Sequence, residues 1–184
     1  MQYLSRMCIL PDWKLDGYRL VFDTLDKEKR RRIGPVHLCY GLKAICGREL
    51  RDVEIDFVAE LLDLIPQGKD HANEVNFEQF AMAAALSERI AVLEPYTRGH
   101  MDPYSIIATK KKAMMMFFVD ASDDCTLPLD DLSNLLSAGR VPEEQVRAIV
   151  NKLAANGDSI SFLDYLTYLP LFNDLHKDIV ENPL

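Results

Sequence analysis

The sequence lacks the features that mark several classes of protein. No stretch approaches the run of about 18 apolar residues that a transmembrane helix needs, so we expect no membrane span. The apolar run near the first residue is too short for a secretory signal. The 4 cysteines form no CxxC pair and no dense framework, which favours reduced thiols in an intracellular, cytoplasmic protein.

Positive charge is also in short supply. The chain has 21 Lys and Arg residues against 29 Asp and Glu residues, which gives a formal net charge of −8. Because domains that bind nucleic acids are usually basic, we expect no nucleic-acid partner.

The common catalytic motifs are missing as well. The sequence contains no HExxH, no GxSxG and no P-loop, and its 4 histidines are scattered. The carboxylates show no pairing that would indicate a general acid and a general base. We therefore expect a protein that is not an enzyme.

Apolar side chains at helical spacing are the feature that the sequence does contain. Of its 184 residues, 48% are hydrophobic, which is enough for one large domain or two small lobes. Pro35 suits the first turn of a helix, and Gly47 and Pro66 suit the ends of helices. The periodicity predicts helices over residues 15–25, 36–45, 52–64, 77–90, 106–119, 129–136, 141–153 and 162–175, with Pro170 kinking or splitting the last of them.

Four apolar, β-prone residues each stand between a polar loop and the start of a helix. They are Ile33, Val75, Leu127 and Ile160. The gap between the second and the third is the longest, which indicates two paired units joined by a connector. We expect an N-terminal segment at 1–14, a first pair at 15–92, a connector at 93–109, a second pair at 110–176 and a tail at 177–184.

This pattern of a helix, a loop of about a dozen residues with an apolar eighth position, and a second helix resembles the EF-hand superfamily. Its repetition in two pairs is similar to calmodulin-like four-hand proteins in particular. The resemblance implies an all-α fold of two EF-hand pairs. It also implies a short β-bridge between the loops of each pair, which would join Ile33 to Val75 and Leu127 to Ile160.

Three of the four loops depart from the metal-binding pattern of the family. A working loop has oxygen ligands at positions 1, 3, 5, 7 and 9, a glycine at position 6 and a glutamate at position 12. The first loop, Asp26–His37, has Arg30 at position 5 and Arg31 at position 6, where a positive side chain would repel a cation. The second loop, Gly68–Gln79, begins with glycine, and the fourth, Leu153–Asp164, begins with leucine. We therefore expect degenerate loops without metal at these three places.

The third loop, Asp120–Asp131, is the best match to the metal pattern. Cys125 replaces the turn glycine, and the last residue is shorter than glutamate, so Mg²⁺ could compete with Ca²⁺. The alternative is an acidic turn whose aspartates favour a helix N-terminus. We expect that the fold requires no cofactor, and that one Ca²⁺ or Mg²⁺ in this loop is the candidate. Its ligands would be Asp120, Ser122, Asp124, the carbonyl of Thr126, and Asp131.

The first loop also carries the densest positive run, KEKRRR at residues 27–32. Arg30, Arg31 and Arg32 could dock an acidic surface of a partner. The alternatives are a solvated loop and, less specifically, a short nuclear address.

A run of methionine and phenylalanine, MMMFF at residues 114–118, allows two interpretations. Methionines line the adaptable grooves of calmodulin-like proteins, so Met114, Met115 and Phe118 could contact a partner. An apolar stripe at helical spacing more often belongs to the core.

The resemblance implies a structural or regulatory binding protein. We expect an adaptor or structural subunit that holds a helix or an extended segment of a larger complex, largely without calcium. Family members with lapsed loops serve on motors, on the cytoskeleton and on the axoneme of the cilium. The alternative is a calcium sensor that acts through the loop Asp120–Asp131 alone.

Overall fold

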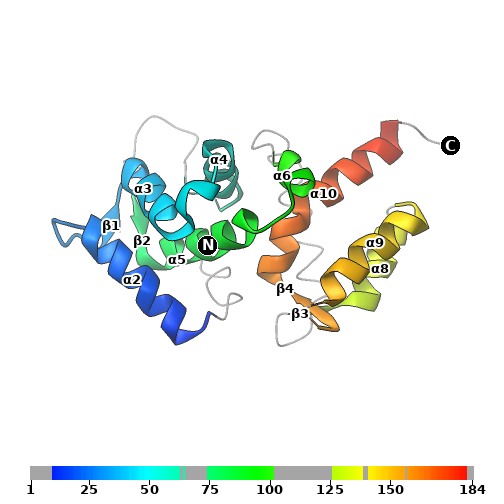
Figure 1. The fold of residues 1–184 in the computed structure, drawn as a ribbon, viewed down its shortest axis with the longest axis horizontal. Coiled ribbons are helices and arrows are strands. Elements are labelled where there is room, and N and C mark those ends of the chain that lie inside the picture. The colour runs from blue at the N-terminus through cyan, green and yellow to red at the C-terminus, as the bar shows by residue number, and fades with distance from the viewer. Residues whose placement is uncertain are drawn as a thin grey trace. The chain divides into compact units, whose positions relative to one another are not determined.

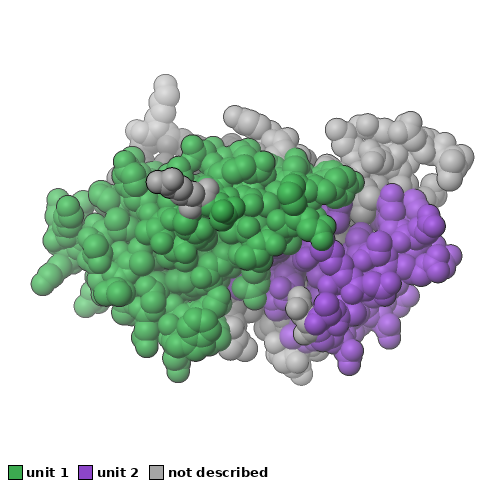
Figure 2. Space-filling model, viewed as in Figure 1, with its two compact units in different colours: residues 1–107 green, residues 108–184 purple. Residues whose placement is uncertain are grey.

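A computed structural model describes residues 10–62, 64, 74–101, 126–138, 141–155 and 157–181, without the side chains of Arg48 and of residues 172–181. The chain forms two compact units, Met1–Ile107 and Ala108–Leu184, which Figure 2 shows in green and purple. Both units consist mainly of helices, and each has one small antiparallel sheet, so the prediction of a mainly helical chain is confirmed. In the described ranges no helix is both long enough and apolar enough to cross a membrane.

The first unit builds its helices from local signals in the sequence. Pro35 stands at the first position of a helix, where its fixed φ is already helical. Gly47 follows the same helix at a φ of 70°, a value that favours glycine. The elements, in chain order in Figure 1, are α2 (Asp12–Leu25), β1 (Arg32–Ile33), α3 (Pro35–Cys46), the 3-10 turn η1 (Gly47–Glu49), α4 (Asp52–Leu61), β2 (Val75–Asn76), α5 (Phe77–Ala91) and α6 (Pro95–Gly99).

The second unit has a similar alternation of short strands and helices. Glu143 and Glu144 lie in the first turn after Pro142, where negative charge is favourable. Its elements are β3 (Thr126–Pro128), α8 (Leu129–Ala138), α9 (Glu143–Ala154), β4 (Ser159–Ser161) and α10 (Phe162–Glu181). The helix that the periodicity predicts over residues 106–119 lies outside the described residues.

Each sheet is one antiparallel pair of very short strands. In the first unit, β1 pairs with β2, and Ile33 stands opposite Val75. In the second unit, β3 pairs with β4, and Leu127 stands opposite Ile160. These are the two residue pairs that the sequence led us to expect. All four side chains are buried, so each pair adds apolar surface to the core of its unit.

Helices α2 and α10 are longer than the sequence-based expectation, and α4 ends at Leu61, before its expected end at residue 64. Helix α2 begins at Asp12, within the expected N-terminal segment, because the carbonyl of Pro11 already accepts hydrogen bonds from the N–H groups of Lys14 and Leu15. Helix α10 continues through Pro170 to Glu181, beyond the expected start of the tail. Proline removes one hydrogen bond from the helix, but the buried side chains before it keep the helix packed.

The expected connector begins with a short helix. Helix α5 ends at Ala91, and α6 follows at Pro95–Gly99, so the two prolines and the glycine of this region do not extend α5. Residues 102–109 of the connector lie outside the described residues.

Helix α5 is the centre of the first unit. It packs against α2, α3 and α4, and its run Ala83–Ala85 is completely buried. Small side chains allow the neighbouring helices to approach closely. Phe22 of α2 lies with its ring centroid 5.7 Å from that of Phe77 and 5.6 Å from that of Phe80. These rings join the start of α5 to α2.

The second unit has its own apolar core. Helix α8 packs against α9, and β4 leads directly into α10. The most deeply buried large side chains come from every element of this unit. They are Leu127, Leu132, Leu153, Ile160, Phe162, Leu166 and Leu169.

Candidate functional site

Asp26 closes the first loop by binding backbone N–H groups. Its Oδ1 accepts a hydrogen bond from the N–H of Arg30 at 2.9 Å, and its Oδ2 accepts one from the N–H of Arg31 at 2.6 Å. Its carbonyl accepts a third, from the N–H of Lys29, at 3.0 Å. Hydrogen bonds to an ionised carboxylate are among the stronger ones in proteins. The carboxylate and the loop backbone therefore hold each other in place.

Arg30 turns back onto the protein and differs in this from its neighbours. Its Nε lies 2.9 Å from Oε2 of Glu28, and its Nη1 lies 3.2 Å from Oε1 of Glu74, just before β2. The other basic side chains of the loop are exposed and form no ion pair with any described residue. They are Lys27, Lys29, Arg31 and Arg32. The structure thus separates Arg30 from Arg31 and Arg32, which the sequence grouped together.

The polar residues that end the second and fourth loops cap helices. Oε1 of Gln79 accepts from the N–H of Asn76 at 2.8 Å, and Oδ1 of Asn76 accepts from the N–H of Gln79 at 2.9 Å. Oδ2 of Asp164 accepts from the N–H of Ser161 at 3.1 Å and from its hydroxyl at 2.5 Å. Reciprocal bonds of this kind satisfy the free N–H groups at the start of a helix. Gln79 and Asp164 therefore stabilise the starts of α5 and α10.

The third loop falls only partly within the described residues. Thr126 lies in β3 opposite Ser161, and Asp131 is exposed in the first turn of α8. A carboxylate there interacts favourably with the helix dipole. Asp120, Ser122 and Asp124 lie outside the described residues. Among the residues that are described, no group of three or more His, Cys, Asp and Glu side chains could hold a metal ion.

Several helices of the first unit expose large apolar side chains, α2 and α3 among them. On α2, Trp13 is 70% exposed and Leu20 is 72% exposed, two turns apart on one face. On α3, Val36 and Tyr40 are similarly exposed, one turn apart. Side chains of this kind are typical of protein-binding surfaces when they lie together. The predicted contact residues Met114, Met115 and Phe118 lie outside the described residues.

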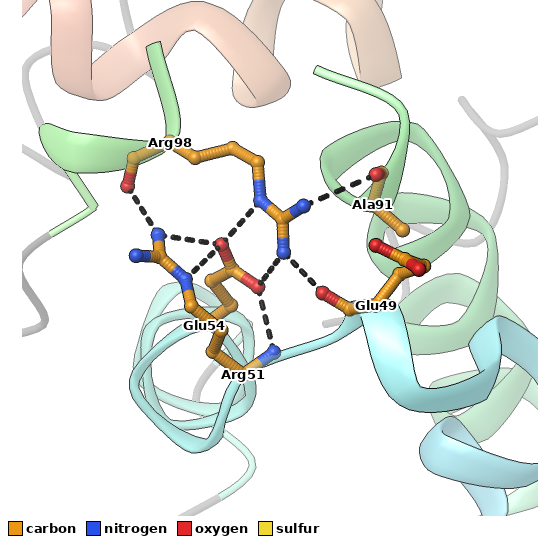
Figure 3. Close-up of polar contacts among 5 residues, drawn as sticks. All are labelled: Glu49, Arg51, Glu54, Ala91 and Arg98. Carbon is orange, nitrogen blue, oxygen red and sulfur yellow. Dashed lines mark hydrogen bonds and ion pairs between the residues drawn. The ribbon is translucent and has the colours of Figure 1, made fainter. Parts of the chain in front are cut away.

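An extensive polar cluster joins α6 to α4 (Figure 3). Glu54, in the first turn of α4, is completely buried. Arg98 of α6 donates from Nε to Oε1 and from Nη2 to Oε2 of Glu54, both at 2.7 Å. Its guanidinium also donates to the carbonyls of Ala91 and Glu49. One arginine therefore contacts α4, the end of α5 and the turn η1.

Arg51 completes the shell around the same carboxylate. Its Nε donates to Oε1 of Glu54 at 2.8 Å, and its backbone N–H donates to Oε2 at 2.8 Å. Its Nη2 donates to the carbonyl of Arg98 at 2.8 Å. A buried charge is tolerated when it is paired and fully hydrogen-bonded, and Glu54 meets this condition.

The electrostatics of this cluster are those of a structural ion pair. Burial raises the pKa of Glu54. Hydrogen bonds from the side chains of Arg98 and Arg51 and from the Arg51 backbone lower it by more, so the pKa of Glu54 lies below its ordinary value. The hydrogen bond to Glu54 raises the pKa of Arg98. Both groups stay ionised near neutral pH, and neither is poised to exchange a proton.

A second cluster joins α2 to α5. Oε2 of Glu88 accepts from Nζ of Lys14 at 2.5 Å and from the hydroxyl of Tyr18 at 2.6 Å. Burial and the bond to Glu88 raise the pKa of Tyr18. Burial, together with the nearby charge of Glu88, raises the pKa of the Cys46 thiol to about 11. Cys46 and Cys39 are free thiols, in keeping with the predicted reduced state of these two.

Sequence reasoning missed Arg98 and Glu54 because they stand 44 residues apart. The one local signal was a glutamate three residues after Arg51 at a helix start, a position from which it can bond back to the backbone. Nothing local marks Arg98 as its partner.

Comparisons with models of known protein families, with curated proteins and with solved structures found no match to this chain.

Proposed function

We propose that this protein is a non-catalytic adaptor or structural subunit, built from two pairs of degenerate EF-hands that keep their shape without metal. The first loop carries the proposal, because Asp26, the residue at its first position, is engaged with the backbone N–H groups of Arg30 and Arg31. Its partner would be a helix or an extended segment of a larger complex. Subunits of motors, of the cytoskeleton and of the ciliary axoneme are the settings that the resemblance suggests.

The paired loops support the EF-hand interpretation. Ile33 faces Val75, and Leu127 faces Ile160, in two separate antiparallel pairs. A strand of two or three residues is too short to be stable alone, and each is flanked by a helix. Two units with this same arrangement, one in each half of the chain, favour a repeated helix–loop–helix origin.

The contacts of the loop ends support metal independence. Gln79 and Asp164 occupy the twelfth positions of the second and fourth loops, and both bond to the residue three positions earlier. A side chain held at its own helix N-terminus must give up these bonds before it can ligate an ion in the loop. In the first loop, the basic side chains would in addition repel a metal cation.

The exposed apolar side chains support a role in protein binding. Trp13 and Leu20 on α2, and Val36 and Tyr40 on α3, leave apolar surface in water that a partner could cover. Aromatic side chains are enriched among the residues that dominate binding energy at protein interfaces.

Unfolding with and without divalent metal tests metal independence. We expect the same melting temperature with Ca²⁺, with Mg²⁺ and with a chelator, and no heat of binding in calorimetric titration. Asp26→Ala should lower the free energy of unfolding by about 1–2 kcal/mol under all three conditions, because two charge-assisted hydrogen bonds are lost. Asp23→Ala is the matched control, since Asp23 is an exposed aspartate near the end of α2, and its loss should change little.

A calorimetric signal that fits one site and disappears in Asp120→Ala would contradict this proposal. It would favour the alternative, a calcium sensor that acts through Asp120–Asp131. An Asp26→Ala variant that loses stability only when calcium is present would also contradict a loop that is stabilised by its own hydrogen bonds without metal.

A further inference from the structure

The first loop presents most of its positive charge to solvent. Five basic residues lie between Lys27 and Arg32, and only Arg30 pairs with acidic side chains of the described chain, Glu28 and Glu74. The remaining four are exposed: Lys27, Lys29, Arg31 and Arg32. We refer to these four side chains as the cationic loop surface.

The backbone of the loop is strained at two of these residues. Lys29 has a φ of 53° and Arg31 has a φ of 59°, both in the left-handed region where glycine is favoured. The three hydrogen bonds to Asp26 hold the backbone in this conformation. Glycine at either position would relieve the strain. Strain of this kind occurs most often at functional sites.

An ion pair links Arg30 of the first loop to the start of the second strand. This ion pair, with Glu74, reaches across to the residue before β2, beside the β1–β2 pair. The exposed cations are therefore held on an ordered turn, so that less conformational entropy is lost when they bind.

We propose that the cationic loop surface docks an acidic peptide segment of a partner protein. This inference deepens the proposed function, because it names a surface of the adaptor and the chemistry of what it holds. Arg31 and Arg32 would supply guanidinium groups, which bind carboxylates in a bidentate manner. The acidic segment would lie along the outside of the turn, away from the buried Ile33.

An acidic peptide fits this surface better than a membrane or a nucleic acid. The whole chain has a net charge of −8, so an extended anionic surface would repel much of the protein. A narrow peptide segment can contact the loop alone. Ile33, the apolar residue that follows the run, is 2% exposed, so the loop offers no apolar anchor for a bilayer.

Fluorescence anisotropy with a labelled, glutamate-rich peptide tests the proposal, in chelator and at about 0.05 and 0.15 M salt. We expect binding that weakens as salt increases. Arg31→Gly and Arg32→Ala should each weaken it by roughly threefold to fivefold, the loss of one exposed ion pair. Arg147→Ala, which removes an exposed arginine of α9, is the control and should bind like the wild type.

Arg31→Gly separates binding from folding. Glycine relieves the positive φ, so this variant should unfold at a temperature no lower than the wild type while it binds more weakly. If Arg31 had only a structural role, Arg31→Gly would unfold at a lower temperature than the wild type and would bind the peptide equally well.

Three results would overturn the proposal: no binding of the peptide, equal binding by all the variants, or binding to phosphatidylserine vesicles in the absence of peptide binding. Because the assay contains chelator, these results do not depend on whether any loop binds metal. Failure of this inference and failure of metal independence can therefore be told apart.

Discussion

Arg98 donates two hydrogen bonds of 2.7 Å to the carboxylate of Glu54, and no part of Glu54 reaches solvent. Arg98 belongs to α6 and Glu54 to α4, and the two residues are 44 positions apart in the sequence. Since Arg98 also bonds to carbonyls of Glu49 and Ala91, it fixes α6 to three other segments (Figure 3). The cluster therefore acts as a structural brace.

Arg98→Ala should destabilise the first unit strongly. The buried carboxylate of Glu54 would keep only its bonds to Arg51, and a buried charge that loses a partner is expensive. We expect the free energy of unfolding to fall by about 2–3 kcal/mol, measured by urea denaturation followed by circular dichroism.

A double-mutant cycle isolates this pair from other effects of truncation. Glu54→Ala and the double variant complete the cycle, and the coupling energy should be about 1.5–3 kcal/mol. Arg147→Ala serves as the control because its ion pair with Glu143 is exposed, at 3.9 Å, and its loss should matter little. Equal effects of Arg98→Ala and Arg147→Ala would mean that the cluster is not a brace.

The same pair should make stability depend on pH in the acid range. The pKa of Glu54 is lower in the folded protein than its ordinary value of 4.5. The contribution of a carboxylate with a lowered pKa is fully present above the unfolded value and is lost as the pH falls through the folded value. The difference in stability between wild type and Arg98→Ala should therefore be constant above about pH 5 and shrink below it. A difference that stays the same down to about pH 3 would contradict this assignment.

Local patterns were sufficient to predict most helices, whereas the two strand pairs were expected from the resemblance to paired EF-hand loops. The apolar periodicity of 77–90 matches α5, and Pro35 and Gly47 mark the ends of α3. These features depend on the nearest few residues, where propensity and capping dominate. The brace depends on a bond between residues far apart in the chain. Helix α10 continues through Pro170 because packing outweighs the local preference of proline.

The four loops show the same division between what is local and what is not. Arg30 at a ligand position and Arg31 at the position of the turn glycine led us to expect a loop that repels cations. The bonds from Asp26 to the loop backbone and from Arg30 to Glu74 could not be predicted, because they depend on where these side chains lie in three dimensions. Nothing in the sequence indicates that Arg30, itself exposed, pairs with Glu28 and Glu74 while Arg31 forms no ion pair with a described residue.

Two glycines in the first unit should respond in opposite ways to alanine. A Cβ at Gly41 of α3 would lie 2.6 Å from Cε2 of Phe80 and 2.9 Å from Cδ1 of Leu25. Phe80 is completely buried and cannot move aside cheaply. Gly41→Ala should therefore lower the free energy of unfolding by about 1–3 kcal/mol in spite of its better helix propensity.

Gly17 of α2 is the matched control, because a Cβ there meets nothing within 4 Å. Gly17→Ala should raise the free energy of unfolding by about 0.5–1 kcal/mol, measured by the same denaturation experiment. A stabilising Gly41→Ala would show that α3 does not approach α5 as closely as the structure has it.

Cys46 should be a slow nucleophile in the folded protein. Burial and the charge of Glu88 raise the pKa of its thiol from 9.0 to about 11, so the thiolate fraction at neutral pH falls on the order of a hundredfold. The rate of alkylation by iodoacetamide can be followed at Cys46 by mass spectrometry. In the folded protein this rate should still rise at pH values where the rate in the urea-unfolded chain has already reached its plateau. Glu88→Gln should shift the folded profile toward lower pH, since it removes a negative charge that favours the protonated thiol. A folded profile that coincides with the unfolded one would show that Cys46 lies in water, away from the Glu88 cluster.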